Sequence, residues 1–440
     1  MGLDRTPNSF VKGTVALSPI EESMISQRED LLAPTYRLLY QRPLHIVRGE
    51  GIWLFDDAGD RYFDFYNNVA SLGHCHPKVV EATQNQLSTL ATNTRYLHDG
   101  IIKASTQLLA TFPSALDKVI YACTGSEAND LAMRLAMKNT GATGVIVTDY
   151  AYHGTTSLLA GMSPTLGPMA PIAPHVRLVP APRGNQQDLP QRFAQDVREA
   201  IDDLEKNGFG VAAFLFDSLF TSDGVYPDPA GFLKPAVERV QDHGGLIISD
   251  EVQPGFGRTG SHFWGFERHG ILPDFVTLGK PMGNGYPVAA VITQANWLEE
   301  FGKDLRYFNT FGGNTVATAV VKAVLDVLQE EGLQDNAAAV GAYFLEALRQ
   351  VSQDHPFVIN ARGAGLYLAV DIVDPDTGTP SKTKTSVIVN ALRNRGFLIS
   401  ICGPDENVLK IRPPLILQAQ HVDLFIAALR ETLVTDLQTV

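Results

Sequence analysis

The stretch that decides the fold is ISDEVQPGFGRTG at 248–260, followed by DFVTLGKPMGNGYP at 274–287. Each stretch contains a short apolar run that ends beside a charged residue, Asp250 in the first and Lys280 in the second. Continuous apolar runs of this length are typical of strands that are buried on both faces of a parallel sheet. Because ligands bind at the carboxyl ends of such strands, we expect both charges at a binding crevice.

The same pattern of apolar strands separated by helices extends over the middle of the chain. Strands are expected at Lys118–Ala122, Gly144–Asp149, Val211–Phe216, Leu246–Ser249 and Phe275–Leu278. Helices are expected at Pro77–Leu90, Ala128–Lys138 and Phe232–His243. Such an alternation predicts an α/β fold with a mainly parallel sheet and helices on both of its faces.

The two ends of the chain are expected to form a smaller domain, because 440 residues exceed what a single core usually supports. The segment 45–65 is typical of an antiparallel meander with tight turns, and a helix is expected near Ile20–Leu39. A long helix at Thr315–Glu331 leads into a C-terminal part with a strand at Gly365–Val370. The predicted division is an N-terminal segment 1–75 that joins the small domain, a large domain 76–320, and a C-terminal small domain 321–440.

The composition is that of an acidic globular protein, with 45% hydrophobic residues and a net charge of −13. A field of that sign repels nucleic acid and acidic membranes, so neither is expected as a partner. The cysteines Cys75, Cys123 and Cys402 form neither a disulfide framework nor a C-x-x-C pair, and no metal site is expected. The sequence shows no apolar signal-peptide core or membrane span, which predicts a cytoplasmic protein.

Two glycine-containing segments are candidates for binding phosphate. In TGSEAND (124–130), Gly125 permits a tight turn and Ser126 stands at the start of a helix. The free N–H groups and the dipole of a helix N-terminus bind phosphate, although an ordinary serine cap would have the same sequence. In NTFGGNTVA (309–317), Thr310 precedes another glycine-rich turn and is a weaker candidate.

Three further side chains fit a flat, charged ligand. Tyr152 in YAYHG (150–154) could stack on a planar ring, or pack as an ordinary aromatic. Asp250 would keep a pyridine nitrogen protonated, unless it belongs only to an acidic loop. Lys280 lies in an apolar context, where burial lowers the pKa of an amine and makes it a nucleophile.

Taken in order, TGSEAND, AYHG, ISDEVQPGFGRTG, TLGKPMGNG and TFGGN resemble the motifs of the class III aminotransferases, which are pyridoxal-phosphate (PLP) enzymes of fold type I. The likeness covers about 45–430. It implies a large domain with a mainly parallel seven-stranded sheet flanked by helices, and a smaller α+β domain built from the N- and C-terminal segments.

The resemblance also implies a role for each site residue. By this resemblance, Lys280 joins the cofactor as a Schiff base and Asp250 pairs with its pyridine nitrogen. Tyr152 covers the ring of the cofactor, and Gln253 lies near its hydroxyl. The phosphate of the cofactor is bound by Gly125, Ser126 and Thr310. In the family this threonine comes from the partner subunit. A homodimer with a shared active site, alone or within a tetramer, is therefore implied.

Five segments resemble one branch of the family, the ethanolamine-phosphate phospholyases. They are NNVASLGHCHP (67–77), NTRYLHD (93–99), DEVQPGFGRTGSHFWGFE (250–267), GKPMGNGYPVA (279–289) and NVLKIRPP (407–414). That branch uses the aminotransferase fold for β-elimination, which here would convert ethanolamine phosphate into acetaldehyde, ammonia and phosphate.

Two departures from the amino-acid aminotransferases agree with this branch. Within 216–225, Ser222 takes the place of the glutamate that gates a carboxylate-binding arginine, and Asp217–Ser218 replace the usual Glu-Pro. Lys410 stands where the gated arginine normally lies, while Arg412 directly precedes the Pro-Pro pair. Since arginine binds a carboxylate bidentately and lysine acts as a point charge, the usual α-carboxylate clamp is absent or altered.

A departing phosphate requires positive charge, so Lys410, Arg412 and Arg95 are the expected substrate contacts, with Tyr66 at the mouth of the site. Arg412 could instead be a structural partner of an acidic residue. Further polar side chains that could line the mouth are Asn67, Asn68 and His98.

Other functions are compatible with the same motifs. The main alternative is a class III aminotransferase that passes the amino group of an amine or ω-amino acid to pyruvate or a similar keto acid. Many such enzymes also lack the gate glutamate. A catalytically silent PLP-binding protein is disfavoured because Lys280 and Asp250 are both present. A Rossmann dehydrogenase is disfavoured because no G-x-G-x-x-G follows an early strand.

Overall fold

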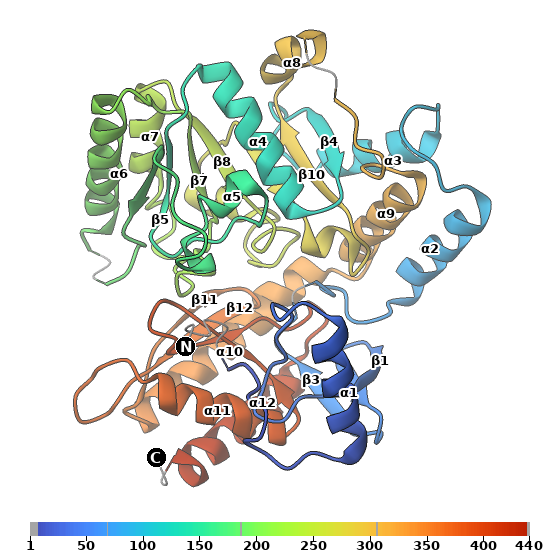
Figure 1. Ribbon diagram of the computed structural model, residues 1–440, viewed down its shortest axis with the longest axis vertical. Coiled ribbons are helices and arrows are strands. Elements are labelled where there is room, and N and C mark those ends of the chain that lie inside the picture. Colours follow the sequence, from blue (N-terminus) through green and yellow to red (C-terminus); the bar gives the residue numbers. More distant parts are fainter. Residues whose placement is uncertain (1–7, 68, 185–186, 305–306, 438–440) are drawn as a thin grey trace.

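The structure is a computed structural model that describes residues 8–67, 69–184, 187–304 and 307–437. Figure 1 shows two bodies, one of cyan, green and yellow elements from the middle of the chain and one that combines blue and red elements from its two ends. The predicted α/β class, with a larger sheet domain and a smaller domain from both ends, is confirmed.

A seven-stranded sheet forms the centre of the large domain, as predicted. Its order is β4 (Lys118–Ala122), β10 (Ala289–Thr293), β9 (Phe275–Leu278), β8 (Leu246–Asp250), β7 (Ala213–Phe216), β5 (Val145–Thr148) and β6 (Val176–Val179). Only β10 runs antiparallel to its neighbours. Strands β7, β8, β9 and β10 are buried along their whole length, because both faces of the sheet are covered by helices.

The helices of the large domain are α2 (Pro77–Thr89), α3 (Asp99–Leu109), α4 (Gly125–Thr140), α5 (Ser157–Ala160), α6 (Leu189–Lys206), α7 (Lys234–Asp242) and α8 (Glu299–Asp304). Short 3₁₀ turns are η1 (Pro164–Leu166), η2 (Gly265–His269), η3 (Lys280–Gly283) and η4 (Ala295–Leu298). Helix α4 packs against β8, β9 and β10, so its N-terminus lies at the carboxyl edge of the sheet centre.

The start of α4 is three residues earlier than the helix expected at Ala128–Lys138. Thr124 accepts a hydrogen bond from the backbone of Glu127, whose side chain accepts from the backbone of Thr124 in return. This capping box satisfies donors that a helix terminus leaves free and fixes the helix start at Gly125. The opposite end stops at Gly141, which adopts a left-handed conformation.

The small domain contains two four-stranded sheets. One has the order β1 (Ile46–Glu50), β2 (Trp53–Asp56), β3 (Arg61–Asp64) and β13 (Phe397–Leu398), and the other β11 (Val358–Ala364), β12 (Tyr367–Ile372), β15 (Val408–Ile411) and β14 (Ser400–Cys402). Its helices are α1 (Pro19–Leu31), α10 (Leu333–Asp354), α11 (Lys382–Asn394) and α12 (Ala419–Thr435). The pairing of β3 with β13 joins the two ends of the chain in one sheet.

The helix expected at Ile20–Leu39 is shorter in the structure, where α1 ends at Leu31. Pro34 lies three residues beyond this end, and proline cannot donate the backbone hydrogen bond that would continue a helix. The residue before a proline also avoids helical backbone angles, which stops the helix upstream.

Helix α9 (Thr315–Glu330) joins the two bodies, as expected of the long helix at this position. It packs against α2 and α3 and leads directly into α10. We propose that the domains comprise residues 1–75, 76–320 and 321–440. The boundary between 320 and 321 then lies inside the continuous helix α9.

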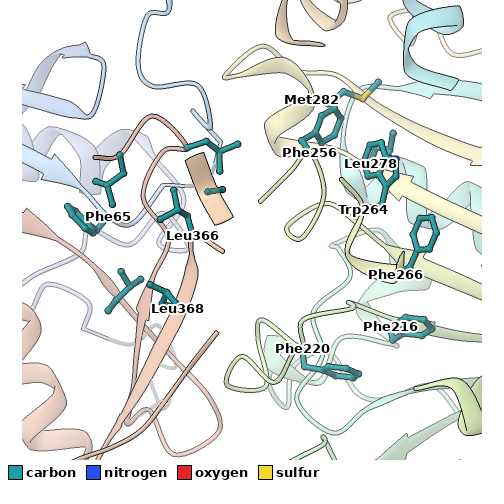
Figure 2. Close-up of a cluster of buried hydrophobic side chains, with 14 of the residues drawn as sticks. Phe65, Phe216, Phe220, Phe256, Trp264, Phe266, Leu278, Met282, Leu366 and Leu368 are labelled. Carbon is teal, nitrogen blue, oxygen red and sulfur yellow. The ribbon is translucent and has the colours of Figure 1, made fainter. Parts of the chain in front are cut away.

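One hydrophobic core extends through both domains. Figure 2 shows its two groups: Phe65, Leu366 and Leu368 come from the small domain, while Phe256, Trp264, Phe266 and Leu278 come from the large domain. All of these side chains are almost completely buried. The hydrophobic core therefore includes side chains from both domains.

Candidate active site

A cavity of about 300 Å³ opens at the carboxyl ends of the parallel strands. Parallel sheets bind ligands at this edge, because several strands deliver their following loops to the same place. The cavity is lined by Val69, Cys123, Thr124, Gly125, Ser126, Asn129, Tyr152, His153, Gly154, Asp217, Asp250, Val252, Gln253, Lys280, Gly285, Tyr286, Pro287 and Val288. Six of the seven predicted cofactor residues are in this set, and Thr310 is the exception.

Lys280 begins η3 immediately after β9 and has a φ of +24°, which non-glycine residues rarely adopt. Burial lowers the pKa of its amine to about 8, with Asp250 opposing this effect and Arg412 and Lys410 reinforcing it. Near physiological pH such a lysine is deprotonated in a much larger fraction than an exposed lysine, and the neutral form of the amine is the nucleophile. The strained backbone directs this one side chain into the cavity wall.

Asp250 ends β8 and is held rigidly by three donors. Its Oδ2 accepts hydrogen bonds from Asn129 Nδ2 at 2.8 Å and from His153 Nδ1 at 2.9 Å, and its Oδ1 accepts from Val252 N at 3.1 Å. Thr277 Oγ1 in turn donates to Asn129 Oδ1 at 2.6 Å. The result is a buried carboxylate with a fixed orientation, suited to accept a proton-bearing nitrogen.

The N-terminus of α4 forms one wall of the cavity. Ser126 Oγ accepts a hydrogen bond from Thr155 N at 3.2 Å, which places the loop after β5 over the start of the helix. A side chain at Gly154 would come within 2.6 Å of Ser126 Oγ, so only glycine permits this approach. Gly125 and Ser126 are thus the first residues of a helix whose leading N–H groups face an open cavity.

Gln253 connects the cavity to the basic residues of the small domain. Its Oε1 accepts hydrogen bonds from Tyr367 OH at 2.9 Å and from Arg412 Nη1 at 3.0 Å, while its Nε2 donates to Thr221 Oγ1 at 2.6 Å. These contacts determine which of the two amide atoms of Gln253 is the oxygen and which is the nitrogen. Tyr152 lies across the same cavity in the loop that follows β5 and is 38% exposed, so its ring is open to a ligand.

Arg412 and Lys410 lie behind this wall and do not themselves line the cavity. Besides binding Gln253, Arg412 donates through Nε to the carbonyl of Tyr66, and its guanidinium lies 4.9 Å from the centroid of that ring. Lys410 is buried and donates to the carbonyl of Thr221 at 2.7 Å. Among the described residues neither cation has a carboxylate partner, so Arg412 is not the acid-paired structural residue considered from sequence.

Thr310 and Arg95 lie away from the cavity of their own chain. Thr310 is exposed and borders a separate hollow, together with Tyr307 and Phe308. The Arg95 guanidinium lies 3.8 Å from the ring centroid of Phe308. Both residues therefore belong to one exposed surface beside the start of α4.

The polar residues expected at the mouth have local structural contacts. Asn67 Oδ1 accepts from Val69 N at 3.0 Å, and His98 Nδ1 accepts from Gly100 N at 3.1 Å at the start of α3. Ser222, at the gate position, accepts from Gly403 N through its carbonyl at 3.1 Å. Asn68 lies outside the described residues.

Several cavity residues were not singled out from the sequence. Asn129 and His153 stand inside the quoted motifs TGSEAND and AYHG, but no local pattern shows that both reach Asp250. Asp217, which the sequence indicated only as a departure from the usual Glu-Pro, also lines the cavity, and its carboxylate accepts hydrogen bonds from the backbone of Leu219 and from Thr221. Burial raises the pKa of Asp217, and hydrogen bonds from Thr221 oppose that rise.

No group of three or more His, Cys, Asp or Glu side chains is placed to hold a metal ion in the described ranges. Within the same ranges, every helix is too short or too polar to cross a membrane.

Comparison with known proteins places these observations in a family. A model of the family described as aminotransferase class-III matches residues 38–433. The chain belongs to the class III aminotransferase family. This class III protein is 38% identical to an alanine–glyoxylate aminotransferase 2-like protein of Drosophila melanogaster, over 94% of this chain and 87% of the relative.

Two other relatives carry lyase names. The class III chain is 35% identical to ethanolamine-phosphate phospho-lyase homolog 1 of Caenorhabditis elegans, over 94% of this chain and 93% of the relative. Among solved structures, a phospholyase from Arthrobacter in complex with phosphoethanolamine matches with a TM-score of 0.91 and 41% identity, covering 94% of this chain and 99% of that one.

Class III enzymes use PLP, and the cavity of this class III protein fits that cofactor. The fit rests on a buried amine of lowered pKa, a fixed carboxylate beside it, and a helix N-terminus of suitable shape for a phosphate. The protein is thus a PLP-dependent enzyme that acts on a small molecule.

Proposed function

We propose that this class III enzyme is a phospho-lyase that eliminates phosphate from ethanolamine phosphate. The observation that carries the proposal is the state of Arg412 and Lys410, which are held by the neutral oxygens of Gln253, Tyr66 and Thr221. Since no carboxylate compensates these two charges within the described residues, they attract an anionic group next to Lys280. The likeness to the Arthrobacter phospholyase supports a phosphate as that group.

We propose that the cofactor residues have the roles implied by the sequence resemblance. Lys280 would join PLP as a Schiff base, and Asp250 would pair with its pyridine nitrogen. Tyr152 would cover the ring, and Gln253 would lie near its hydroxyl. Gly125 and Ser126 would hold its phosphate. PLP, when bound, supplies an electron sink that stabilises negative charge on the amine-bearing carbon of the substrate.

The side chains of this enzyme would then move protons and bind charge. Lys280 Nζ would remove a proton from the amine-bearing carbon, because it is the buried amine of the cavity and its pKa is lowered to about 8. Asp250, fixed by Asn129 and His153, would keep the ring nitrogen protonated. Arg412, with Lys410 behind it, would stabilise the departing phosphate. The overall reaction converts ethanolamine phosphate and water into acetaldehyde, ammonia and phosphate.

The deciding test uses the purified enzyme with PLP and ethanolamine phosphate, without any keto acid. We expect repeated release of inorganic phosphate and acetaldehyde, far beyond one equivalent per active site, because an elimination regenerates the enzyme in every cycle. Unphosphorylated ethanolamine is the matched control and is expected to give no acetaldehyde. Turnover that begins only after pyruvate is added would contradict the proposal.

That last outcome would identify the second candidate function, an aminotransferase that acts on an amine or ω-amino acid. It is favoured by the 38% identity to the alanine–glyoxylate aminotransferase 2-like relative. The two reactions share every cofactor residue and diverge only after Lys280 has removed the proton. The acceptor requirement therefore separates them directly.

We also propose that two copies share their active sites. Thr310 lies outside the cavity of its own chain, on a surface with the exposed aromatic side chains of Tyr307, Phe308 and Phe311. Exposed apolar groups of this density are typical of an interface with another protein. A second copy would bury them and bring Thr310, with Arg95 beside it, to the cavity of its partner.

Mixed dimers test this arrangement. Lys280→Ala and Thr310→Asp are each expected to inactivate the enzyme, the second by placing a negative charge against the cofactor phosphate. Co-expression of both variants should restore about one quarter of the wild-type activity, because half of the dimers would be mixed and each would hold one intact site. If co-expression restores nothing while mixed dimers form, Thr310 does not act across the interface.

A further inference from the structure

Arg258 is a buried cation that the proposed reaction does not use. Its side chain is 2% exposed, and among the described residues it has no carboxylate partner. Burial lowers the pKa of its guanidinium to about 10. The nearby charge of Arg412 contributes to this lowering, while Tyr367 and Asp64 oppose it, and the group stays charged at neutral pH. A buried arginine without an acid is unfavourable, and its contacts explain why this position holds one.

One guanidinium nitrogen of Arg258 joins two loop segments of the small domain, one before β12 and one after β15. Nη1 donates to the carbonyl of Leu366 at 3.1 Å, and the same atom donates to the carbonyl of Pro413. The backbone carbonyl of Arg258 also accepts from Leu366 N at 3.1 Å. A side chain at Gly365 would come within 2.3 Å of that carbonyl, so the two loops approach as closely as their backbones allow.

The two carbonyls stand next to the two residues that converge on Gln253. Leu366 precedes Tyr367, whose hydroxyl donates to Gln253 Oε1 at 2.9 Å. Pro413 follows Arg412, whose Nη1 donates to the same oxygen at 3.0 Å. Arg258 therefore holds the backbone beside both donors, while its own loop belongs to the large domain that carries Gln253.

We infer that Arg258 is a positioning residue, which sets Arg412 and Tyr367 against Gln253 and so shapes the site for an anionic substrate group. The inference rests on the proposed role of Arg412. Arg258 does not line the cavity, so its action passes through the backbone of Leu366 and Pro413. The side chain of Arg412 ends on an acceptor fixed to the other domain, so a small shift of β15 would move its guanidinium away from the substrate.

The test compares Arg258→Met with the wild-type holoenzyme, using inorganic phosphate as the probe. Methionine keeps the apolar length of the side chain and removes every donor. We expect kcat/KM for ethanolamine phosphate to fall by about 10²-fold, since a misplacement of roughly 1 Å has an effect of this size on a rate. The KM and the dissociation constant for phosphate, measured by calorimetry, should rise, and kcat should fall because Arg412 would stabilise the departing phosphate. The absorbance of bound PLP should stay as in the wild type, because Lys280 and Asp250 keep their contacts.

A purely structural role predicts a different result. Arg268→Met is the matched control. Arg268 lies in η2, is mostly buried, and forms an ion pair with Asp228 at 2.6 Å, and it makes no contact with Gln253 among the described residues. It should lower the melting temperature and leave phosphate binding unchanged. If Arg258→Met lowers the melting temperature and leaves the phosphate dissociation constant within twofold of wild type, the positioning role is wrong.

Arg258→Lys keeps the test decisive if the methionine variant does not fold. Lysine retains the charge, but its single ammonium lies one bond closer to the backbone and spans the two carbonyls less well. Its phosphate dissociation constant should lie several-fold above that of wild type, and an unchanged value would overturn the inference. If the wild-type enzyme turns over only with a keto acid, the proposed lyase function is wrong. The role of Arg258 is then tested separately, because its variants should raise the KM for the keto acid, which is also an anion.

Discussion

Lys280→Ala is expected to lower kcat by at least about 10⁴-fold, because the variant loses both the covalent attachment of PLP and the general base. In the described part of the chain, no other group that lines the cavity is a free amine or an unengaged base that could replace Lys280 as the general base. The carboxylate of Asp217 also lines the cavity, but it already accepts hydrogen bonds from Thr221 and from the backbone of Leu219. The rest of the cofactor cradle does not depend on the lysine side chain.

Stopped-flow release of phosphate and the absorbance of the purified protein test this expectation together. The variant should still contain PLP, held by Gly125 and Ser126, but without the absorbance of a lysine-bound form. Lys138→Ala removes an exposed lysine that pairs with Glu300 at 3.2 Å, and it should behave as wild type. Turnover of Lys280→Ala within tenfold of wild type would show that the reactive amine lies elsewhere.

Asp250→Asn is expected to lower kcat by about 10³-fold, because it removes the charge that would keep the ring nitrogen protonated. Asparagine has the same shape, and its oxygen can still accept from Asn129 and His153. Its amide nitrogen would then face Val252 N, which donates to Asp250 Oδ1 at 3.1 Å in the native site, so one buried hydrogen bond is lost. The cofactor should remain joined to Lys280.

The measurement is the single-turnover rate of phosphate release, with the absorbance of bound PLP recorded in the same samples. Asp274→Asn is the matched control, since Asp274 is also buried but stands at the opposite end of β9, where it accepts from Ile247 N at 2.8 Å. It should lower the melting temperature without a comparable loss of kcat. An Asp250→Asn enzyme with near-native rates would mean that this carboxylate only supports the fold.

Most of the fold, and the position of Asp250 and Lys280 at the candidate cavity, could be predicted from local sequence. Apolar runs such as those of β7, β8 and β9 identify buried strands because a strand covered on both faces tolerates few polar residues. The same logic places Asp250 and Lys280 at the carboxyl edge of the sheet. Strand direction is not encoded in such a run, and the antiparallel β10 was not among the expected strands.

The resemblance of the motifs to a known family added what no pattern could provide. It identified the cofactor, and the class III family is confirmed by the match over residues 38–433. The phosphate specificity rests on weaker sequence evidence, since Ser222 shows only that a gate carboxylate is missing. Its physical counterpart, a cation held by neutral oxygens, is visible only in the structure.

By itself, therefore, the sequence determined an α/β fold and the residues that meet at the end of its central strands, because burial and strand ends are local properties of the chain. Only the tertiary structure decided how Arg412, Gln253 and Arg258 meet. The Arg412 and Gln253 side chains are separated by 159 positions, and their approach depends on how two domains pack. Side-chain direction across such a distance is set by the assembled core and not by any local pattern.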